Sequence, residues 1–468
     1  MTAALRPPGT APGALPLLGH ALRMKRSPGP FLVELQSGDP VTVIRLGRKP
    51  MYVVNDPGLM CDVMRRPDVF ARGGPITERF RLLFGNGLGI SDGEFHRRQR
   101  RLIMPAFQHG QLADYAAVMS RHAEAKAASW RDGQRIAVHE EMDELALANI
   151  VRVLVADDVV LDRVRFMAAA AVVLGGLFRR ITDTTGLLTR LPTRANRRYR
   201  EAEAFLRRTV EAVIDEYLAA GADRGDLLST MVLARDEDGR RAMSDEQVRD
   251  EVMTFLIAGS NTISNTLSWA FHELGAHPDA ERRLHDEVDR VLAGRTATHE
   301  DVVHLDHTRR VVTETLRLRT QGLFQSRVTT ADAELGGYRV PAGTVVLYSA
   351  HALNHNPGIH ADPGRFDPDR WLAYREHPLA PGAFLPFGTG VHGCIGERLS
   401  WVELVISLAT IAARWRLTPV PEHRVRPKPA ITMPVNALPM TAHRRDVRPG
   451  ARVAGAAAQT SQDREESR

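Results

Sequence analysis

Cysteine is scarce in this sequence, since only Cys61 and Cys394 occur among its 468 residues. Two cysteines so far apart exclude a disulfide-stapled scaffold, and the lack of a C-x-x-C pair argues against a structural zinc site. Such sparing use of cysteine is typical of a reducing compartment, so we expect a cytoplasmic protein. A lone cysteine is most often a buried and inert side chain, and this is our interpretation of Cys61.

Long apolar runs are also missing. The first eight residues contain neither an apolar segment able to span a bilayer nor the basic start and apolar core of a signal peptide. The apolar stretch 167–178 is only 12 residues long and is flanked by Arg165 and Arg179, which suits a core helix better than a membrane span. We therefore expect a soluble protein with no membrane span.

Aromatic residues make up only 6% of the chain, and charge of neither sign dominates. The 62 basic residues exceed the 56 acidic ones slightly and give a net charge of +6. This excess does not indicate nucleic-acid binding, although it could favour docking of an acidic protein partner. A hydrophobic content of 43% suits a large, mostly helical globular enzyme.

The second cysteine lies in an unusual setting. Glycines crowd the segment Phe387-Gly388-Thr389-Gly390-Val391-His392-Gly393-Cys394-Ile395-Gly396, and an apolar helical pattern follows it. Glycine lets a backbone turn tightly and approach a flat ligand closely. A thiolate at the start of a helix is stabilised by the helix dipole and by free N–H groups. Cys394 is therefore a candidate axial ligand for haem iron.

The same letters also match G-x-G-x-x-G, from Gly388 to Gly393, which is the fingerprint of dinucleotide-binding sites. Such a site needs a strand before the glycines and an acidic residue about 20 positions after them. Pro386 interrupts the approach, and no Asp or Glu lies between Glu403 and Glu422. We therefore reject a nucleotide site.

The spacing Phe387-x-x-Gly390-x-His392-x-Cys394-x-Gly396 resembles the haem-binding signature of the cytochrome P450 monooxygenases. Weaker resemblances extend over nearly the whole chain. They imply a mainly α-helical haem-thiolate fold with small β-sheets, in which Cys394 ligates the iron of haem b.

The resemblance also implies a reaction and its partners. One oxygen atom from O2 would be inserted into an unactivated C–H bond, with electrons from NAD(P)H. These electrons would arrive through a separate ferredoxin reductase and ferredoxin, and the enzyme would act as a monomer. We expect a single catalytic domain over residues 1–445. Residues 446–468 are polar and rich in Gly and Ala, so we expect a disordered tail there.

Local patterns predict several elements of this fold. Strands are expected over 41–46 and 51–54, joined as a hairpin, and helices over 56–66, 250–272 and 397–414. Residues 70–90 are predicted to form a loop, because Gly and Pro recur among them.

The predicted helix over 250–272 has an unusual centre, Ala258-Gly259-Ser260-Asn261-Thr262. Glycine inside a helix costs about 1 kcal/mol relative to alanine, so a packing or ligand reason is expected. The centre resembles the oxygen-binding motif of the family. This implies that Ala258 and Gly259 let the helix pass flat against haem, and that Thr262 positions a water that supplies protons. The sequence departs from the family at Asn261, where an acidic residue is usual.

His96 and Arg100 lie four positions apart, so they share one face of a helix and can reach a single anionic group. The resemblance implies that this group is a haem propionate and that Arg327 and His392 complete the set. Three neighbouring arginines form either a basic face for the redox partner or a solvated helix surface: Arg97, Arg98 and Arg101.

A structural triad is implied by Glu314-x-x-Arg317 together with Arg370 of the segment 366–371. A buried carboxylate flanked by two guanidinium groups is satisfied only as a unit, because an unpaired buried charge is expensive. We expect these three residues to hold the cysteine loop beneath the haem.

The substrate chamber implied by the resemblance has apolar walls. Its predicted members come from the 70–90 loop, the region around 167–178, the segment after Arg317 and the C-terminal segment 431–438: Leu82, Leu83, Phe84, Phe166, Leu174, Phe178, Leu323, Phe324 and Val435. Ordinary core packing is the alternative for any one of them.

Three short stretches resemble sesquiterpene oxidases of actinobacteria, especially pentalenene oxygenases: Gly73-Gly74-Pro75 and residues 96–101 and 191–198. They favour a terpene of secondary metabolism as substrate, with a fatty acid, steroid or polyketide as alternatives. Two other classes are a haem peroxygenase and a non-catalytic haem sensor. Thr262 argues against the first, and nothing in the chain resembles the output domain that a sensor needs.

Overall fold

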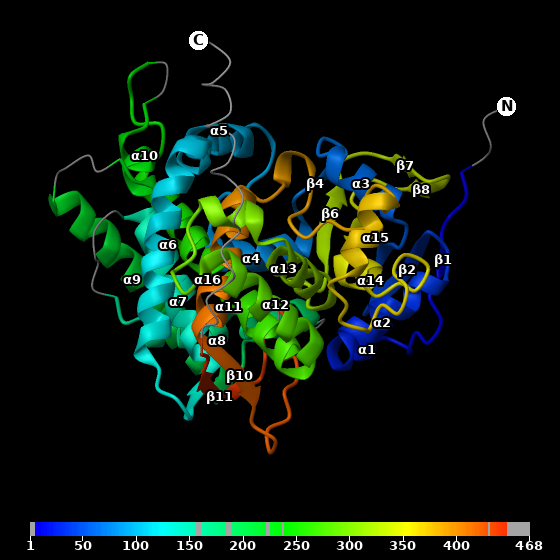
Figure 1. Ribbon diagram of the computed structural model, residues 1–468. Coiled ribbons are helices and arrows are strands. Elements are labelled where there is room, and N and C mark those ends of the chain that lie inside the picture. The colour runs from blue at the N-terminus through cyan, green and yellow to red at the C-terminus, as the bar shows by residue number, and fades with distance from the viewer. Residues whose placement is uncertain are drawn as a thin grey trace, which may run out of the picture.

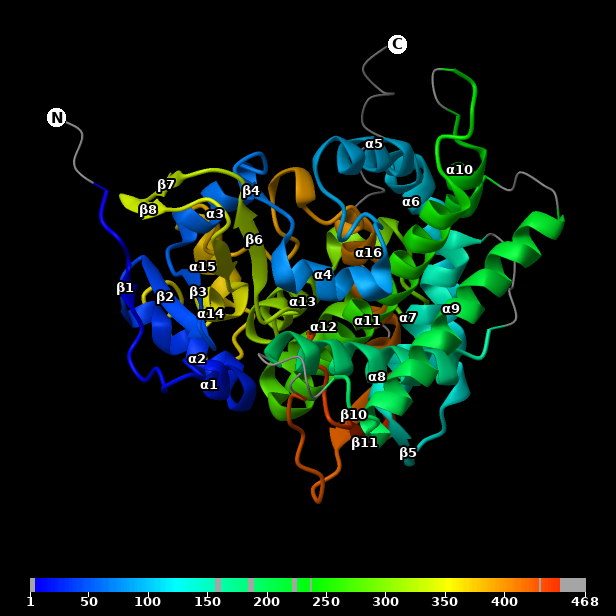
Figure 2. The same ribbon diagram turned by 180° about the vertical axis from the view of Figure 1, so that it is seen from behind.

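The computed structural model describes residues 5–155, 161–183, 189–220, 225–235, 238–428 and 431–446. Helices dominate it, as predicted. Figures 1 and 2 show a large helical part and, beside it, a smaller part near the N-terminus where most of the strands gather. None of the described helices is long and apolar enough to cross a bilayer.

The described residues contain sixteen α-helices. Their bounds are α1 Ala21–Arg26, α2 Pro28–Glu34, α3 Pro57–Arg65, α4 Gly74–Phe84, α5 Gly93–Ile103, α6 His109–Ser129, α7 Val138–Leu154, α8 Arg163–Thr182, α9 Arg194–Ala220, α10 Leu227–Leu233, α11 Asp245–Ala276, α12 Pro278–Leu292, α13 Asp306–Leu318, α14 Ala350–Asn354, α15 Arg370–Glu376 and α16 Glu397–Arg414. Four short 3₁₀ helices are η1 Leu35–Ser37, η2 Met104–Phe107, η3 Glu300–His304 and η4 Gly390–His392.

The strands form three sheets. Their bounds are β1 Gly9–Thr10, β2 Val41–Leu46, β3 Lys49–Val54, β4 Phe70–Ala71, β5 Gln134–Ala137, β6 Gln325–Thr329, β7 Ala333–Leu335, β8 Tyr338–Val340, β9 Val345–Tyr348, β10 Trp415–Pro419 and β11 Pro439–Arg444. The largest sheet has the order β1-β2-β3-β9-β6-β4, the second β10-β11-β5, and the third pairs β7 with β8.

The predicted hairpin is confirmed, because β2 and β3 are antiparallel with Val41 opposite Val54. In the same sheet β6 lies antiparallel to β9, so that Gln325 is opposite Tyr348 and Arg327 is opposite Val346. This register brings Arg327 and Tyr348, which are far apart in sequence, to one side of the site described below.

Helix α11 runs through the helical part and packs against α7, α9, α13 and α16. It is longer than predicted at both ends. A capping box closes its start, since the Ser244 hydroxyl accepts from the Gln247 N–H and the Gln247 side chain accepts from the Ser244 N–H. Its end is set by Pro278, which begins α12. Helix α16 has the predicted bounds.

The prediction of a loop over residues 70–90 is wrong, because Gly74–Phe84 form helix α4. Pro75 occupies the first turn, where proline is favoured, and Gly85 follows the last residue with a φ of 53°. Ile76, Thr77, Leu83 and Phe84 are buried on one face. The glycines and the proline therefore punctuate a helix rather than exclude one.

The C-terminal part of the described chain returns to the site. Pro427 and Val435 form an isolated antiparallel bridge, which closes the segment predicted to enter the pocket. Ile431, in that segment, lines the cavity described below. The disordered tail was predicted over residues 446–468, and 447–468 lie outside the described residues.

Candidate active site

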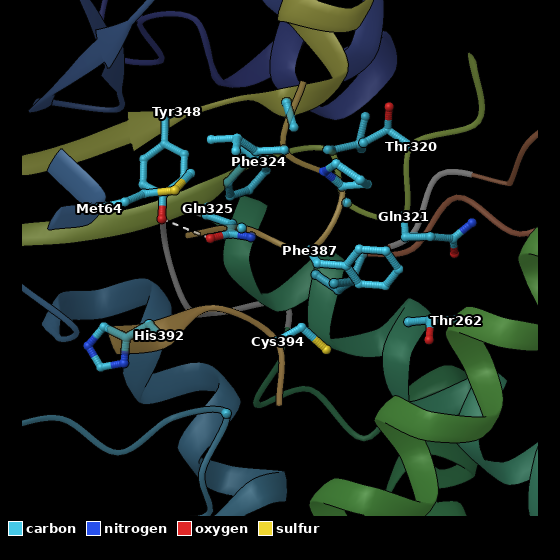
Figure 3. Close-up of a pocket in the computed structure, with 18 of the residues that line it drawn as sticks. Met64, Thr262, Thr320, Gln321, Phe324, Gln325, Tyr348, Phe387, His392 and Cys394 are labelled. Atoms are coloured by element: carbon cyan, nitrogen blue, oxygen red, sulfur yellow. Dashed lines mark hydrogen bonds between the residues drawn. The ribbon is translucent and has the colours of Figure 1, made fainter. Parts of the chain in front are cut away.

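A single cavity of about 420 Å³ contains both the cysteine and the threonine that the sequence singles out. Its walls include residues of α3, α4, α8, α11, α13, α14, α16, β6 and β9, of the segment before β6 and of the loop that carries Cys394. Figure 3 shows the Cys394 sulfur pointing to the side on which Thr262 lies, with Phe387 and Gln321 above them. The cysteine loop and the centre of α11 therefore form opposite walls of one site.

The cysteine loop is held in a narrow turn. The Cys394 N–H donates to the Phe387 carbonyl at 2.8 Å, and Gly388 and Gly390 adopt φ values of 70° and 72°. A side chain at Gly390 would lie 2.8 Å from the Met64 carbonyl, so only glycine lets the loop pack against the end of α3. The glycine spacing of the motif is thus a steric requirement of this turn.

Burial raises the pKa of the Cys394 thiol, and the nearby Glu397 carboxylate acts in the same direction. Two groups oppose this rise: the Gly396 N–H, which donates to the sulfur, and the positive charge of Arg100. The side chain is open to the cavity and forms no disulfide. Cys394 is therefore a single soft ligand aimed into the site, whereas Cys61 is buried in α3.

Cationic side chains line the opposite end of the cavity from α11. We call Arg72, Arg327 and His392 the cationic cluster. Burial, followed by repulsion from Arg327, lowers the pKa of Arg72 to about 9. The guanidinium of Arg327 donates to the Ser326 carbonyl at 2.8 Å and lies 5.5 Å from the Tyr348 ring, with no carboxylate paired to it in the described part of the chain.

His392 is anchored on one side only. Its Nε2 lies 2.9 Å from an oxygen of Asp92, whereas its buried Nδ1 has no hydrogen-bond partner among the described residues. Burial lowers the pKa of His392, and the charges of Arg72 and Arg327 lower it further. An anionic ligand of the cavity would pair with the two guanidinium groups and would favour the protonated form of His392, in which Nδ1 can donate to it.

His96 and Arg100 lie behind the cysteine loop instead of lining the cavity. His96 contacts the Val391 carbonyl at 3.1 Å through Nε2, and Arg100 donates to the Gly393 carbonyl at 2.7 Å. Burial lowers the pKa of His96 to about 4, which keeps the ring neutral near pH 7. In this structure both side chains support the backbone of the loop, and neither meets the cavity as the propionate prediction expects.

The centre of α11 combines a cavity residue with two packing residues. Thr262 lines the cavity, and its hydroxyl donates to the Ala258 carbonyl at 2.9 Å. Gly259 faces α7, where an added Cβ would lie 2.7 Å from the Ile150 side chain. The glycine therefore permits close packing of two helices, which differs from the predicted contact with haem. Ala258 is solvent-accessible but is absent from the cavity wall.

Asn261 is buried and does not line the cavity. Its amide oxygen accepts from the Thr432 hydroxyl at 2.7 Å and from the Asn265 amide at 3.4 Å. Asn261 thus ties α11 to the C-terminal segment whose Ile431 lines the site.

The structure brings Glu314, Arg317 and Arg370 together as a buried unit. Arg317 donates to both carboxylate oxygens of Glu314, at 2.9 and 2.7 Å, and Arg370 donates at 2.9 Å. The Trp371 indole and the Asp367 N–H also donate to this carboxylate, at 3.0 Å each. The outer nitrogens of the two arginines reach backbone carbonyls of the 354–365 region.

Three of the nine predicted wall residues line the cavity: Phe178, Leu323 and Phe324. The structure places the other six elsewhere. Leu82 is 53% exposed on the outer side of α4. The remaining five are buried in the hydrophobic core without lining the cavity: Leu83, Phe84, Phe166, Leu174 and Val435.

Sequence reasoning missed Arg72 and Asp92. Arg72 precedes α4 in a segment interpreted as a loop, and Asp92 is the N-cap of α5, where its carboxylate accepts from the Gly93 N–H at 2.9 Å. Although burial raises it, hydrogen bonds from His392 and Gly93 hold the pKa of Asp92 below its ordinary value. An N-cap signal before a helix could have indicated Asp92.

Comparison with known proteins settles the family. The cytochrome P450 family model matches residues 7–440. The chain belongs to the cytochrome P450 family. A crystal structure of the cytochrome P450DA haem domain is 27% identical, covers 95% of this chain and 99% of that one, and superposes with a TM-score of 0.82.

Curated relatives from Streptomyces match most of the chain. Cyclooctat-9-en-7-ol 5-monooxygenase of Streptomyces melanosporofaciens is 44% identical over 88% of this chain and 90% of its own. Pentalenene oxygenase of Streptomyces avermitilis is 40% identical over 90% of this chain and 93% of its own. The predicted fold class and the monooxygenase class are confirmed.

The residues of the site fit the haem b that this family uses. A thiol lies at one wall, and at one end the cationic cluster supplies two guanidinium groups without a paired carboxylate among the described residues, as the two propionates of haem require. When bound, haem supplies the activation of O2 with electrons derived from NAD(P)H. The protein supplies the axial ligand, the charge balance and the shape of the chamber.

Proposed function

We propose that this P450 monooxygenase hydroxylates a terpenoid, with Cys394 as the thiolate ligand of haem iron. The single observation that carries the assignment is the position of Cys394 in one cavity with Thr262 and the cationic cluster. Arg72, Arg327 and His392 would bind the propionates, because they line one end of the cavity and neither guanidinium is paired with a carboxylate among the described residues.

The roles of the remaining residues follow from their contacts. Arg100 and His96 hold the backbone of the cysteine loop from behind, so they are positioning residues. The Thr262 hydroxyl is oriented by its bond to the Ala258 carbonyl, which leaves its lone pairs free to hold a water beside the substrate. Asn261 cannot titrate and is held by Thr432, so protons would pass by Thr262 without it.

The substrate class rests on the walls and on the relatives. Phe178, Leu323 and Phe324 make the chamber apolar near Thr262. The curated relatives are named for terpenoids, pentalenene and cyclooctat-9-en-7-ol. A terpenoid skeleton would bury its hydrocarbon surface against these walls, and its shape would decide which C–H bond faces the haem.

Bacterial members of the family typically receive electrons from a ferredoxin and its reductase. We propose the same pair here, with the protein acting as a monomer in the cytoplasm, where two free cysteines are stable. The exposed Arg97 and Arg101 on α5 are suited to an acidic ferredoxin, although both also contact Glu94 of their own helix.

Two variants test the ligand assignment. The ferrous carbonyl complex of the wild type and of Cys61→Ser should show the absorption band of thiolate ligation, and Cys394→Ser should lose it. Loss of the band in Cys61→Ser alone would overturn the assignment.

Titration with sesquiterpenes and diterpenes should convert the haem spectrum from low spin to high spin. A shift with fatty acids and none with any terpenoid would refute the substrate class.

A further inference from the structure

Polar side chains at the α11 end of the cavity present hydrogen-bond acceptors. Thr262 and Thr266 lie four positions apart on one face of α11 and both line the cavity. Each hydroxyl donates to a carbonyl of its own helix, Thr262 to Ala258 at 2.9 Å and Thr266 to Thr262 at 2.8 Å. Their protons are used, so what they offer a ligand is lone pairs.

Gln321 adds a stronger acceptor to this end. Its Nε2 donates to the Arg319 carbonyl at 3.2 Å, which identifies Oε1 as the free acceptor of the amide. Its Oε1 is buried and has no hydrogen-bond partner among the described residues, although the side chain lines the cavity. A buried acceptor without a donor costs free energy, so this oxygen favours any ligand that brings a donor.

Two contacts fix Gln321 beside α11. Arg319 lies over the Trp269 ring at 4.3 Å and pairs with Glu273 at 2.7 Å. Trp269 is one helical turn beyond Thr266, so the segment that carries Gln321 is anchored next to the two threonines. Because the terminal amide torsion is broad, the side chain can turn Oε1 to a donor in the cavity, at the expense of the 3.2 Å bond to the Arg319 carbonyl.

The two ends of the cavity are therefore complementary to different ligands. The cationic cluster offers donors and suits the anionic propionates. The α11 end offers acceptors and would repel an anion, whereas a pure hydrocarbon would leave Gln321 without a donor. A neutral hydrogen-bond donor on an otherwise apolar skeleton would bond to the Gln321 acceptor and also bury its hydrocarbon surface against the apolar walls.

We propose that the substrate is a terpenoid that already carries a hydroxyl group, and that this hydroxyl donates to Gln321 beside Thr262 and Thr266. The inference rests on the proposed terpenoid function and narrows it to terpenoid alcohols. An earlier step must then install the hydroxyl, either an oxygenation or a cyclisation that ends with capture of water. Gln321 becomes a residue that determines specificity.

Ligands of one skeleton test this without any mutation. A panel of cyclic sesquiterpene alcohols, cedrol among them, would be compared with the methyl ether and the parent hydrocarbon of each alcohol, by titrating the spin-state shift of the haem-loaded wild type. An alcohol can donate a hydrogen bond, its ether can only accept, and the hydrocarbon does neither. We expect at least one alcohol to bind roughly three- to tenfold tighter than both analogues, the value of one net hydrogen bond.

Variants then locate the contact. Gln321→Leu keeps the approximate size of the side chain and removes the acceptor. The ratio of the affinity for that alcohol to the affinity for its analogues should fall to nearly one, while the affinity for the hydrocarbon stays the same or rises. Gln111→Leu on α6, which does not line the cavity, is the matched control and should keep the preference. Haem content and thermal midpoint exclude a general defect.

The outcomes separate the two proposals. Equal affinity of the wild type for every alcohol and its analogues would overturn the hydroxyl inference and leave the terpenoid function standing. An alcohol preference that survives Gln321→Leu would overturn the role of Gln321. Absence of a shift with every terpenoid, alongside a shift with fatty acids, would overturn both. If Gln321→Leu fails to load haem, the comparison of alcohol with ether in the wild type still decides the first point.

Discussion

Two arginine clusters of the protein differ in how completely their charges are paired. In the Glu314 cluster, formed by Glu314, Arg317 and Arg370, the carboxylate receives five donors and the guanidinium groups end on backbone carbonyls. In the cationic cluster, Arg72 and Arg327 repel one another, and a buried nitrogen of His392 has no partner among the described residues.

The difference indicates that the Glu314 cluster is structural and that the cationic cluster belongs to the ligand site. A buried charge is tolerated only when it is paired and fully hydrogen-bonded. The Glu314 cluster meets this condition by itself, so it needs no ligand. The cationic cluster does not meet it, and it borders the cavity that contains Cys394. An incomplete polar cluster on a cavity wall therefore indicates the charge of the ligand.

Breaking the Glu314 cluster should have the largest effect on stability. Glu314→Ala leaves two guanidinium groups buried without their carboxylate, which costs about 3–5 kcal/mol. We expect little soluble, haem-loaded protein, measured by expression yield and by haem content. Glu376→Ala, at the exposed end of α15, is the control and should behave like the wild type. Normal haem content in Glu314→Ala would mean that the cluster does not hold the loop.

Another buried carboxylate, that of Glu403, has an intermediate number of partners. Glu403 is buried, and the Asn149 amide donates to it at 2.9 Å. Burial raises the pKa of Glu403 to about 8. The native state therefore keeps a proton that the unfolded chain releases above its ordinary pKa, near 4.3. The contribution of protonated Glu403 to the free energy of unfolding is fully present below the unfolded-state pKa and is lost as the pH rises through the native-state pKa of about 8.

Glu403→Gln should remove this dependence. Relative to the wild type, the variant should gain on the order of 2 kcal/mol between pH 6 and pH 9. Thermal midpoints across that range would show it, with Glu422→Gln on the surface as the control. Parallel midpoints of Glu403→Gln and wild type at all pH values would contradict a protonated Glu403.

Removing Arg327 from the cationic cluster should have opposite effects on the haem-free and the haem-loaded protein. Arg327→Leu relieves repulsion with Arg72, so the haem-free protein should become more stable by about 1 kcal/mol. The haem-loaded protein should lose its cofactor roughly tenfold faster, measured by transfer of haem to apomyoglobin. Arg339→Leu, an exposed residue paired with Asp332, is the control. Destabilisation of both states would make Arg327 a structural residue.

The smallest effect on folding is expected at Thr262. Its hydroxyl bonds only within α11, so Thr262→Ala should change stability by less than about 0.5 kcal/mol. It should nevertheless release more hydrogen peroxide per NAD(P)H oxidised and form less product, whereas Thr262→Ser should retain coupling. Asn261→Asp should be tolerated, because a carboxylate still accepts from Thr432 and Asn265. Unchanged coupling in Thr262→Ala would remove its proposed role.

Local patterns determined much of the protein from the sequence alone. The cysteine loop follows from its glycine spacing, because Gly388 and Gly390 adopt positive φ values that favour glycine. Helix α16 and the β2–β3 hairpin follow from periodicity and turn residues. The pairing of Glu314 with Arg317 follows from their spacing of three on a helix. In each case the atoms that decide the structure are close together in the chain.

The remainder depends on contacts between distant segments, which a single sequence does not encode locally. Gly259 is small because Ile150 of α7 lies against it, and Asn261 is bound by Thr432 of the C-terminal segment. Arg72 meets Arg327 only because β4, β6 and β9 share a sheet. Apolar residues such as Leu83 and Phe166 suit a core and a pocket wall equally well. Only the tertiary structure decides between the two, because their chemistry is the same and their neighbours differ.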